Sequence, residues 1–173
     1  ALKLLLTRYH NSEDAAPVAP MLEPSLTLDL LGWAALRLHG IEGEGYRRDA
    51  LISALEDDLR NAERLRQHWS SPAVFISEVA ERTGLLIPDT GRVRDASAYS
   101  FPHRTFREFL AATALERDMN VIRRGAYRSH QSELSRVLAE GRLRPERWAE
   151  VLALTCGRLG AYGANDLVQR ITQ

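Results

Sequence analysis

Apolar residues recur along most of the chain at the three- and four-residue spacing of α-helices. Residues 26–38 are apolar nearly all round, and a helix without a polar face is usually buried at the centre of a domain. Ser25 precedes this stretch, where its hydroxyl can cap the first turn. In residues 47–66 the apolar positions lie one turn apart, at Leu51, Leu55 and Leu59. Because Asp57, Asp58 and Arg60 lie between them, this second helix is predicted to have a solvated side.

A third helix and a β-hairpin are predicted next. Ser71-Pro72 is a helix start, with a capping residue followed by proline in the first turn, and Gly84 is a stop. The apolar stripe between them consists of Phe75, Ile76, Val79 and Ala80. Residues 85–87 and 99–101 then flank a turn-rich stretch, which indicates two paired strands with a long tip. Three helices followed by a hairpin is the order of a winged-helix domain.

The remaining residues predict further helices. Thr105 and Glu108 match a capping box at a helix start. The residues predicted to be buried there are Phe106, Phe109, Leu110 and Ala114. Later helices are predicted at 133–138, 144–159 and 165–172. On the second of these, one face carries Trp148, Val151, Leu152, Thr155, Cys156 and Leu159.

These elements predict a mainly α fold in three parts. Residues 1–24 contain the end of a helix, at 1–9, and an exposed connection, residues 25–118 form a winged-helix domain, and residues 119–173 form a helical, solenoid-like segment. The chain opens inside an apparent helix and without methionine, as an excised fragment does.

Composition narrows the functional classes. Twenty-three basic and 23 acidic residues give zero net charge, which disfavours a dedicated nucleic-acid or anionic-membrane binder. No apolar run approaches the ~20 residues of a membrane span.

The single cysteine, Cys156, excludes an internal disulfide and is predicted to be a small core residue. Four histidines show no spacing that suggests a metal site: His10, His39, His68 and His130. Lys3 is the only lysine, as in GC-rich bacterial genomes, and a reducing cytoplasm is the expected location.

The most specific segment is 99–112, Tyr-Ser-Phe-Pro-His-Arg-Thr-Phe-Arg-Glu-Phe-Leu-Ala-Ala. It resembles the aromatic-x-His-x-Thr-Phe-Gln-Glu-Phe-x-Ala-Ala signature that ends the winged-helix domain of NACHT-type signal-transduction ATPases. Three shorter runs are similar to family segments in the same order: Leu-Leu-Leu-Thr-Arg-Tyr at 4–9, Glu-Arg-Thr-Gly-Leu-Leu at 81–86 and Trp-Ala-Glu-Val-Leu at 148–152. The family commonly has Gln where this chain has Arg107, and that position is expected to be exposed.

The resemblance implies a role for His103. This histidine comes just before a helix start, where free N–H groups and the helix dipole favour an anion. In the family, the matching histidine reaches the β-phosphate of ADP and holds the winged helix against the ATPase core. Exchange of ADP for ATP then releases the closed state and leads to oligomerisation. Bacterial relatives are often linked to defence and signalling.

The catalytic parts of such an ATPase are not in this sequence. It contains no G-x-x-x-x-G-K-[ST] phosphate loop. The resemblance implies that this loop, the magnesium ligands and the ATPase chemistry precede Ala1. The chain is therefore expected to have no enzymatic activity, and ADP, ATP and magnesium are expected only in the complete protein, with its own N-terminal NTPase domain as partner.

Three other interpretations remain open. His103 can be a structural histidine that ties the hairpin to the helix. The chain can be a DNA-binding winged-helix protein, although the candidate recognition helix, 71–83, offers Glu78 and Glu81 against only Arg82. Arg92 and Arg94 in the hairpin tip favour that interpretation. The third is a plain helical scaffold for protein interactions.

Overall fold

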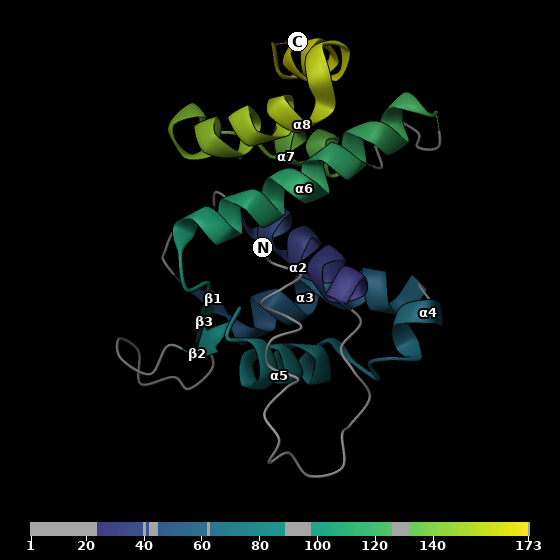
Figure 1. Cartoon of the computed structure of the whole chain (residues 1–173), viewed down its shortest axis with the longest axis vertical. Coiled ribbons are helices and arrows are strands. Elements are labelled where there is room, and N and C mark those ends of the chain that lie inside the picture. The colour runs from purple at the N-terminus through teal and green to yellow at the C-terminus, as the bar shows by residue number, and fades with distance from the viewer. Residues whose placement is uncertain are drawn as a thin grey trace. The chain divides into compact units, whose positions relative to one another are not determined.

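The chain is mainly helical, with one small three-stranded antiparallel sheet (Figure 1). The computed structural model describes residues 24–39, 41, 45–61, 63–88, 98–125 and 132–172. The helix end predicted at 1–9, the connection up to residue 23 and the hairpin tip with Arg92 and Arg94 lie outside these residues. The chain divides into two compact units: the first unit is Ala1–Leu31 with Gly43–His103, and the second unit is Gly32–Glu42 with Arg104–Gln173.

Helix α2 (Pro24–Leu38) contributes its first half to the first unit and its second half to the second unit. It begins at Pro24, which lacks an N–H group and therefore loses nothing in a first helical turn. Ser25 thus lies inside the helix, and its predicted capping role is wrong. The predicted burial is confirmed for most of its apolar residues, such as Leu30, Leu31 and Leu36, which are almost wholly shielded from solvent. Leu28 and Trp33 are only half-buried.

The amphipathic helix predicted at 47–66 is two helices, α3 (Arg48–Asn61) and α4 (Glu63–Arg66). Its predicted faces are confirmed, because Leu51, Leu55 and Leu59 are buried while Asp57 and Arg60 are exposed.

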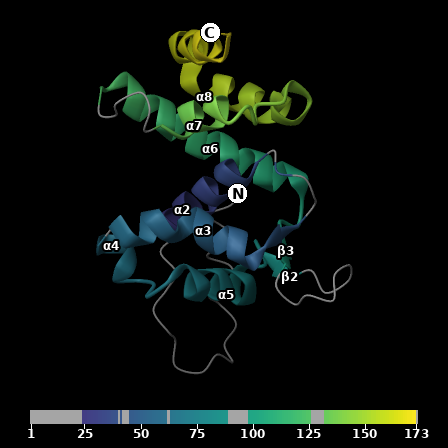
Figure 2. The ribbon, with the colours of Figure 1, turned by 180° about the vertical axis from the view of Figure 1, so that it is seen from behind.

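Helix α5 (Pro72–Thr83) has the predicted limits. The Ser71 hydroxyl oxygen accepts a hydrogen bond from the backbone N–H of Val74 at 3.3 Å. Gly84 ends the helix with φ of 62°, a left-handed conformation that glycine adopts without steric cost. Phe75, Ile76 and Val79 are buried, and α5 packs against α3, beside which it lies in Figures 1 and 2.

The sheet has one strand more than predicted. Strands β1 (Tyr46–Arg47), β2 (Ile87–Pro88) and β3 (Ala98–Ser100) are ordered β1-β3-β2, with Tyr46 opposite Tyr99 and Ile87 opposite Ser100. Leu85 and Leu86, predicted to be strand residues, precede β2 and are buried.

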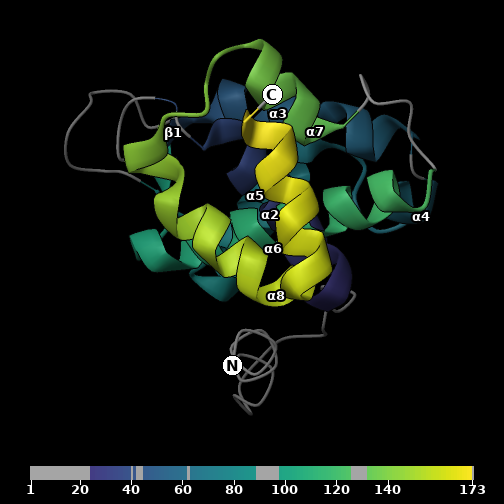
Figure 3. The ribbon, with the colours of Figure 1, turned by 90° about the horizontal axis from the view of Figure 1, so that it is seen from above.

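The second unit consists of the end of α2 with α6 (Arg104–Arg123), α7 (Glu133–Ala139) and α8 (Pro145–Thr172). Helix α8 packs along α6 (Figure 3). Gly32 allows a close approach of α2 to α6, since a Cβ atom there would lie 3.2 Å from the Leu110 carbonyl oxygen. The predicted domain boundary at residue 118 falls inside α6, and the domain limits at 25 and 118 stay predictions.

Helix α8 is two helical segments in one element. Gly160, with φ of 68° and ψ of 177°, interrupts the helical backbone between them. The sequence predicted helices at 144–159 and 165–172, and the second segment begins earlier than expected. Trp148, Val151 and Thr155 are buried as predicted, whereas Cys156 is half-buried.

Candidate functional site

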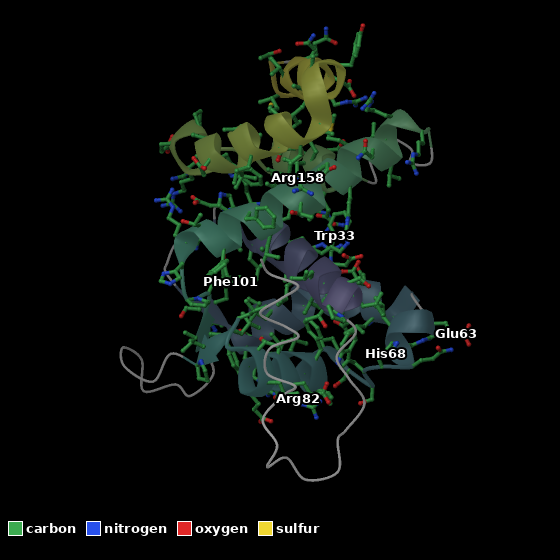
Figure 4. All side chains as sticks on the ribbon, viewed as in Figure 1. Trp33, Glu63, His68, Arg82, Phe101 and Arg158 are labelled. Atoms are coloured by element: carbon green, nitrogen blue, oxygen red, sulfur yellow. The ribbon has the colours of Figure 1, made fainter. Side chains whose placement is uncertain are left out.

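His103 is an exposed side chain that comes after strand β3 in the sequence and directly before the first residue of α6. The residue two positions earlier, Phe101, is buried and packs edge-on against Tyr46, with ring centroids 6.1 Å apart. Phe101 is labelled beside the sheet in Figure 4. The residue after His103 is the first of α6. The backbone is therefore anchored just before His103, while the imidazole itself faces solvent.

The first turn of α6 carries no acidic side chain. The helix begins at Arg104, so that Thr105 lies inside it and the predicted capping box is wrong. Glu108 is only 4% exposed, and its carboxylate accepts a hydrogen bond from Arg104 Nε at 2.7 Å instead of returning to the helix start. The N-terminal end of a helix of this length attracts anions through its free N–H groups and its dipole.

The Arg107 side chain is less exposed than the sequence predicted. It is half-buried, and its Nε atom is shielded from solvent without a hydrogen-bond partner among the described residues. An arginine can lay its aliphatic part along an apolar surface, which explains why a predicted surface position is partly covered.

The aromatic residues of this segment are also less buried than predicted. Phe106 and Phe109 are half-buried, whereas Leu110 and Ala114 are buried as expected. The guanidinium of Arg158 lies 5.5 Å from the centre of the Phe109 ring, a cation–π distance (Figure 4 labels Arg158). Phe109 therefore lies at the edge of the contact between α6 and α8.

The second unit contains a buried ionic cluster that sequence reasoning missed. Arg37 Nε donates to Glu133 Oε1 at 2.9 Å, and Asp118 Oδ2 accepts from the backbone N–H of Leu134 at 3.0 Å. These residues come from α2, α6 and α7. Arg37 and Glu133 are 96 positions apart, and no local pattern connects them.

His39 is a second buried polar residue of this unit, for which the sequence predicted no role. Its Nε2 atom lies 3.0 Å from the carbonyl oxygen of Arg147, and its ring meets Trp148 edge-on with centroids 4.7 Å apart. Nδ1 has no hydrogen-bond partner among the described residues. Burial lowers the pKa of His39 below 6.5, and the nearby Arg107 also lowers it.

Other sites are not assembled in the described part of the chain. No group of three or more His, Cys, Asp or Glu side chains there could hold a metal ion, with His10 and His130 outside that part. No helix within the same residues is long and apolar enough to cross a membrane. On the candidate DNA-recognition helix, Glu78 accepts a hydrogen bond from Trp69 Nε1 at 2.9 Å and so belongs to the packing of the first unit.

Comparisons of the chain with protein-family models, with curated proteins and with solved structures find no match.

Proposed function

We propose that this chain is the regulatory, nucleotide-state-sensing part of a NACHT-type signal-transduction ATPase. Residues 25–118 are its winged-helix domain, and residues 119–173 begin a helical, solenoid-like segment. The observation that carries the proposal is the exposure of His103 directly before α6, within the motif at 99–112. In this assignment the chain supplies no catalytic residue.

The order of elements supports the winged-helix part of the proposal. Helices α2, α3 with α4, and α5 are followed by the antiparallel pair β2 and β3. The buried Phe101 ring, two residues before His103 in the first unit, anchors the backbone that carries the imidazole. A fixed donor binds a phosphate oxygen at a smaller entropic cost than a donor on a flexible loop.

The proposed mechanism is a nucleotide-dependent closure. A neutral imidazole has one N–H group and can donate it to the β-phosphate of ADP. That contact links this chain to the ATPase domain of the complete protein in the inactive state. Replacement of ADP by ATP with magnesium breaks the contact, which shifts the population towards an open, oligomerising form.

Replacing His103 in the complete gene product tests this function. His103→Ala is expected to release bound ADP faster than the unchanged protein, measured as nucleotide content after gel filtration, and to activate more readily. His103→Gln, which keeps an N–H donor, is expected to retain part of the ADP. The matched control is His68→Ala, at another exposed histidine. Equal ADP content in all four folded proteins would contradict the phosphate contact and favour a structural histidine or a plain scaffold.

The sequence of the complete gene product also tests whether the protein is a signal-transduction ATPase. A phosphate-binding loop and an acidic magnesium-binding strand in the complete sequence are required by the proposal, and a complete product without them overturns it. The isolated 173-residue chain is expected to show no measurable ADP binding by calorimetry. Salt-sensitive binding of duplex DNA by the same chain would instead support a DNA-binding winged helix.

A further inference from the structure

Two buried carboxyl groups lie at the junction of α6, α7 and α2 in the second unit. Asp118, on α6, is 1% exposed, and Glu133, the first residue of α7, is 7% exposed. Each carboxyl has one oxygen that is shielded from solvent and lacks a hydrogen-bond partner among the described residues, Oδ1 of Asp118 and Oε2 of Glu133.

The cations at this junction act on Glu133. Arg37, on α2, donates from Nε to Glu133 Oε1 at 2.9 Å. Arg136 on α7 places Nη1 3.7 Å from the same oxygen, on a side chain that is 52% exposed. Within the described residues, Asp118 has no cation at ion-pair distance and receives only backbone N–H groups at the start of α7.

A buried carboxylate without a cation is costly, and a protein usually lowers this cost by keeping the group protonated. Burial raises the pKa of Asp118, and the negative charge of Glu133 raises it further. The N–H groups of Leu134 and Glu133, and the charge of Arg37, act in the opposite direction. The charged groups that face Asp118 are therefore Glu133 from α7 and Arg37 from α2.

We propose that the buried Asp118 carboxyl keeps its proton in the folded chain, and that its contact with the start of α7 is a pH-sensitive latch that fastens α7 to α6. In the closed latch the neutral Asp118 carboxyl accepts from the backbone N–H of Leu134, while Arg37 neutralises the Glu133 carboxylate. When the proton leaves, two negative charges face each other in a buried site, and the start of α7 loosens. This inference concerns the second unit alone and does not depend on the proposed nucleotide contact.

The direction of the pH effect follows from the raised pKa. The folded state holds the Asp118 proton more tightly than the unfolded state does, where the ordinary pKa is 3.8. The stabilisation from this proton is thus complete below pH 3.8 and is lost as the pH rises through the folded pKa. An ordinary ionised capping carboxylate would behave in the opposite way, with stability lost on acidification.

Asp118→Asn distinguishes these two possibilities. The asparagine amide imitates a protonated carboxyl, because it is uncharged and its oxygen can accept from the backbone N–H of Leu134. The full chain is unfolded by heat at a series of pH values from 4 to 8, as the unchanged protein and as the variant. Asp166→Asn is the control, since Asp166 forms a part-exposed pair with Arg170 one turn away in the same unit.

The latch predicts that Asp118→Asn gains stability over the unchanged protein as the pH rises. Between pH 4 and pH 8, the midpoint temperature of the variant is expected to rise relative to that of the unchanged protein by about 2–4 °C. Hydrogen exchange at the Leu134 amide is expected to quicken with pH, beyond its intrinsic dependence, in the unchanged protein and not in the variant. A loss of stability in Asp118→Asn that is largest at high pH would overturn the latch and make Asp118 an ionised cap.

A second variant tests the same proposal if Asp118→Asn does not fold. In Glu133→Gln the like charge is removed, so the carboxyl carbon of Asp118 is expected to titrate at lower pH by ¹³C nuclear magnetic resonance than in the unchanged protein. Titration of Asp118 at or below pH 3.8 in the unchanged protein would also overturn the proposal.

Discussion

Among the residues that the structure describes, the first unit buries almost only apolar side chains, whereas the second unit buries charged and polar ones as well. Seven polar or charged residues are buried in the described part of the chain, and Thr27 is the one that belongs to the first unit. The other six are His39, Glu108, Asp118, Ser132, Glu133 and Thr155. The first unit is therefore stabilised mainly by apolar packing and helix caps, and the second unit also depends on specific polar contacts.

This difference has energetic consequences. Apolar packing tolerates conservative changes at small cost, because a neighbouring side chain of similar volume can fill the space. A buried polar contact tolerates no loss of one partner, because the other is left desolvated and unpaired. Removal of a buried charged partner in the second unit should thus be harmful, whereas removal of an exposed charged partner in the first unit should be nearly neutral.

The largest expected loss is at Trp148, which is fully buried and donates from its indole N–H to the Arg142 carbonyl oxygen at 3.0 Å. Trp148→Ala is expected to lower the free energy of unfolding by about 3–5 kcal/mol, measured by urea denaturation. Tyr162→Ala, on the same helix at a side chain 87% exposed, is expected to change it by less than about 0.5 kcal/mol. Similar losses in both variants would contradict the described packing of α8.

Arg37→Ala tests the buried ionic cluster directly. Removing this guanidinium leaves the Glu133 carboxylate buried without its nearest cation, at a cost of about 3 kcal/mol. The same substitution in the first unit, Arg60→Ala, breaks an exposed pair with Glu56 and is expected to cost less than about 1 kcal/mol. If urea denaturation gives equal values, the proposed difference between the units is wrong.

A moderate loss is expected at the start of α5. Ser71→Ala removes the acceptor of the Val74 N–H group and is expected to destabilise the first unit by about 1 kcal/mol. Ser70→Ala, at the exposed neighbouring residue, should have no measurable effect. An equal effect of both substitutions would show that the Ser71 cap does not contribute.

The smallest effect depends on pH. Because burial lowers the pKa of His39, the folded state disfavours its protonated form. The stability that this residue provides is complete above pH 6.5 and is lost as the pH falls towards the lowered folded pKa. At pH 6 the loss is expected to be less than about 1 kcal/mol, and His39→Gln should remove it. Thermal unfolding of both proteins at pH 6 and 8 checks this, and an unchanged pH dependence in His39→Gln would exclude His39 as its source.

Local signals explain what the sequence predicted well. Helix α5 has a cap, a first-turn proline and a left-handed glycine, each within a few residues of its ends, and all three are in place. Helix α7 begins at the predicted Glu133 because Ser132 caps it through the N–H group of Ser135. In both helices, the contact that determines the helix boundary joins residues that are close together in the sequence.

Long-range contacts explain what the sequence did not predict. Strand β1 is two residues long and forms by pairing with β3, about fifty positions later, so that its own residues carry no strand pattern. The capping box at Thr105 failed because Arg104 joined the helix and took the Glu108 carboxylate. The partners of Arg37 and His39 are each about a hundred positions away.

The contact between His103 and the β-phosphate is tested most directly by combining one substitution with two nucleotides. Affinities of the complete protein and of its His103→Ala variant are measured for ADP and for AMP, which lacks the β-phosphate. The proposed contact predicts that the variant loses affinity for ADP by roughly tenfold, the value of one hydrogen bond to a charged group, and keeps its affinity for AMP. Equal losses for both nucleotides, or none for either, would contradict the contact and with it the proposed sensing role.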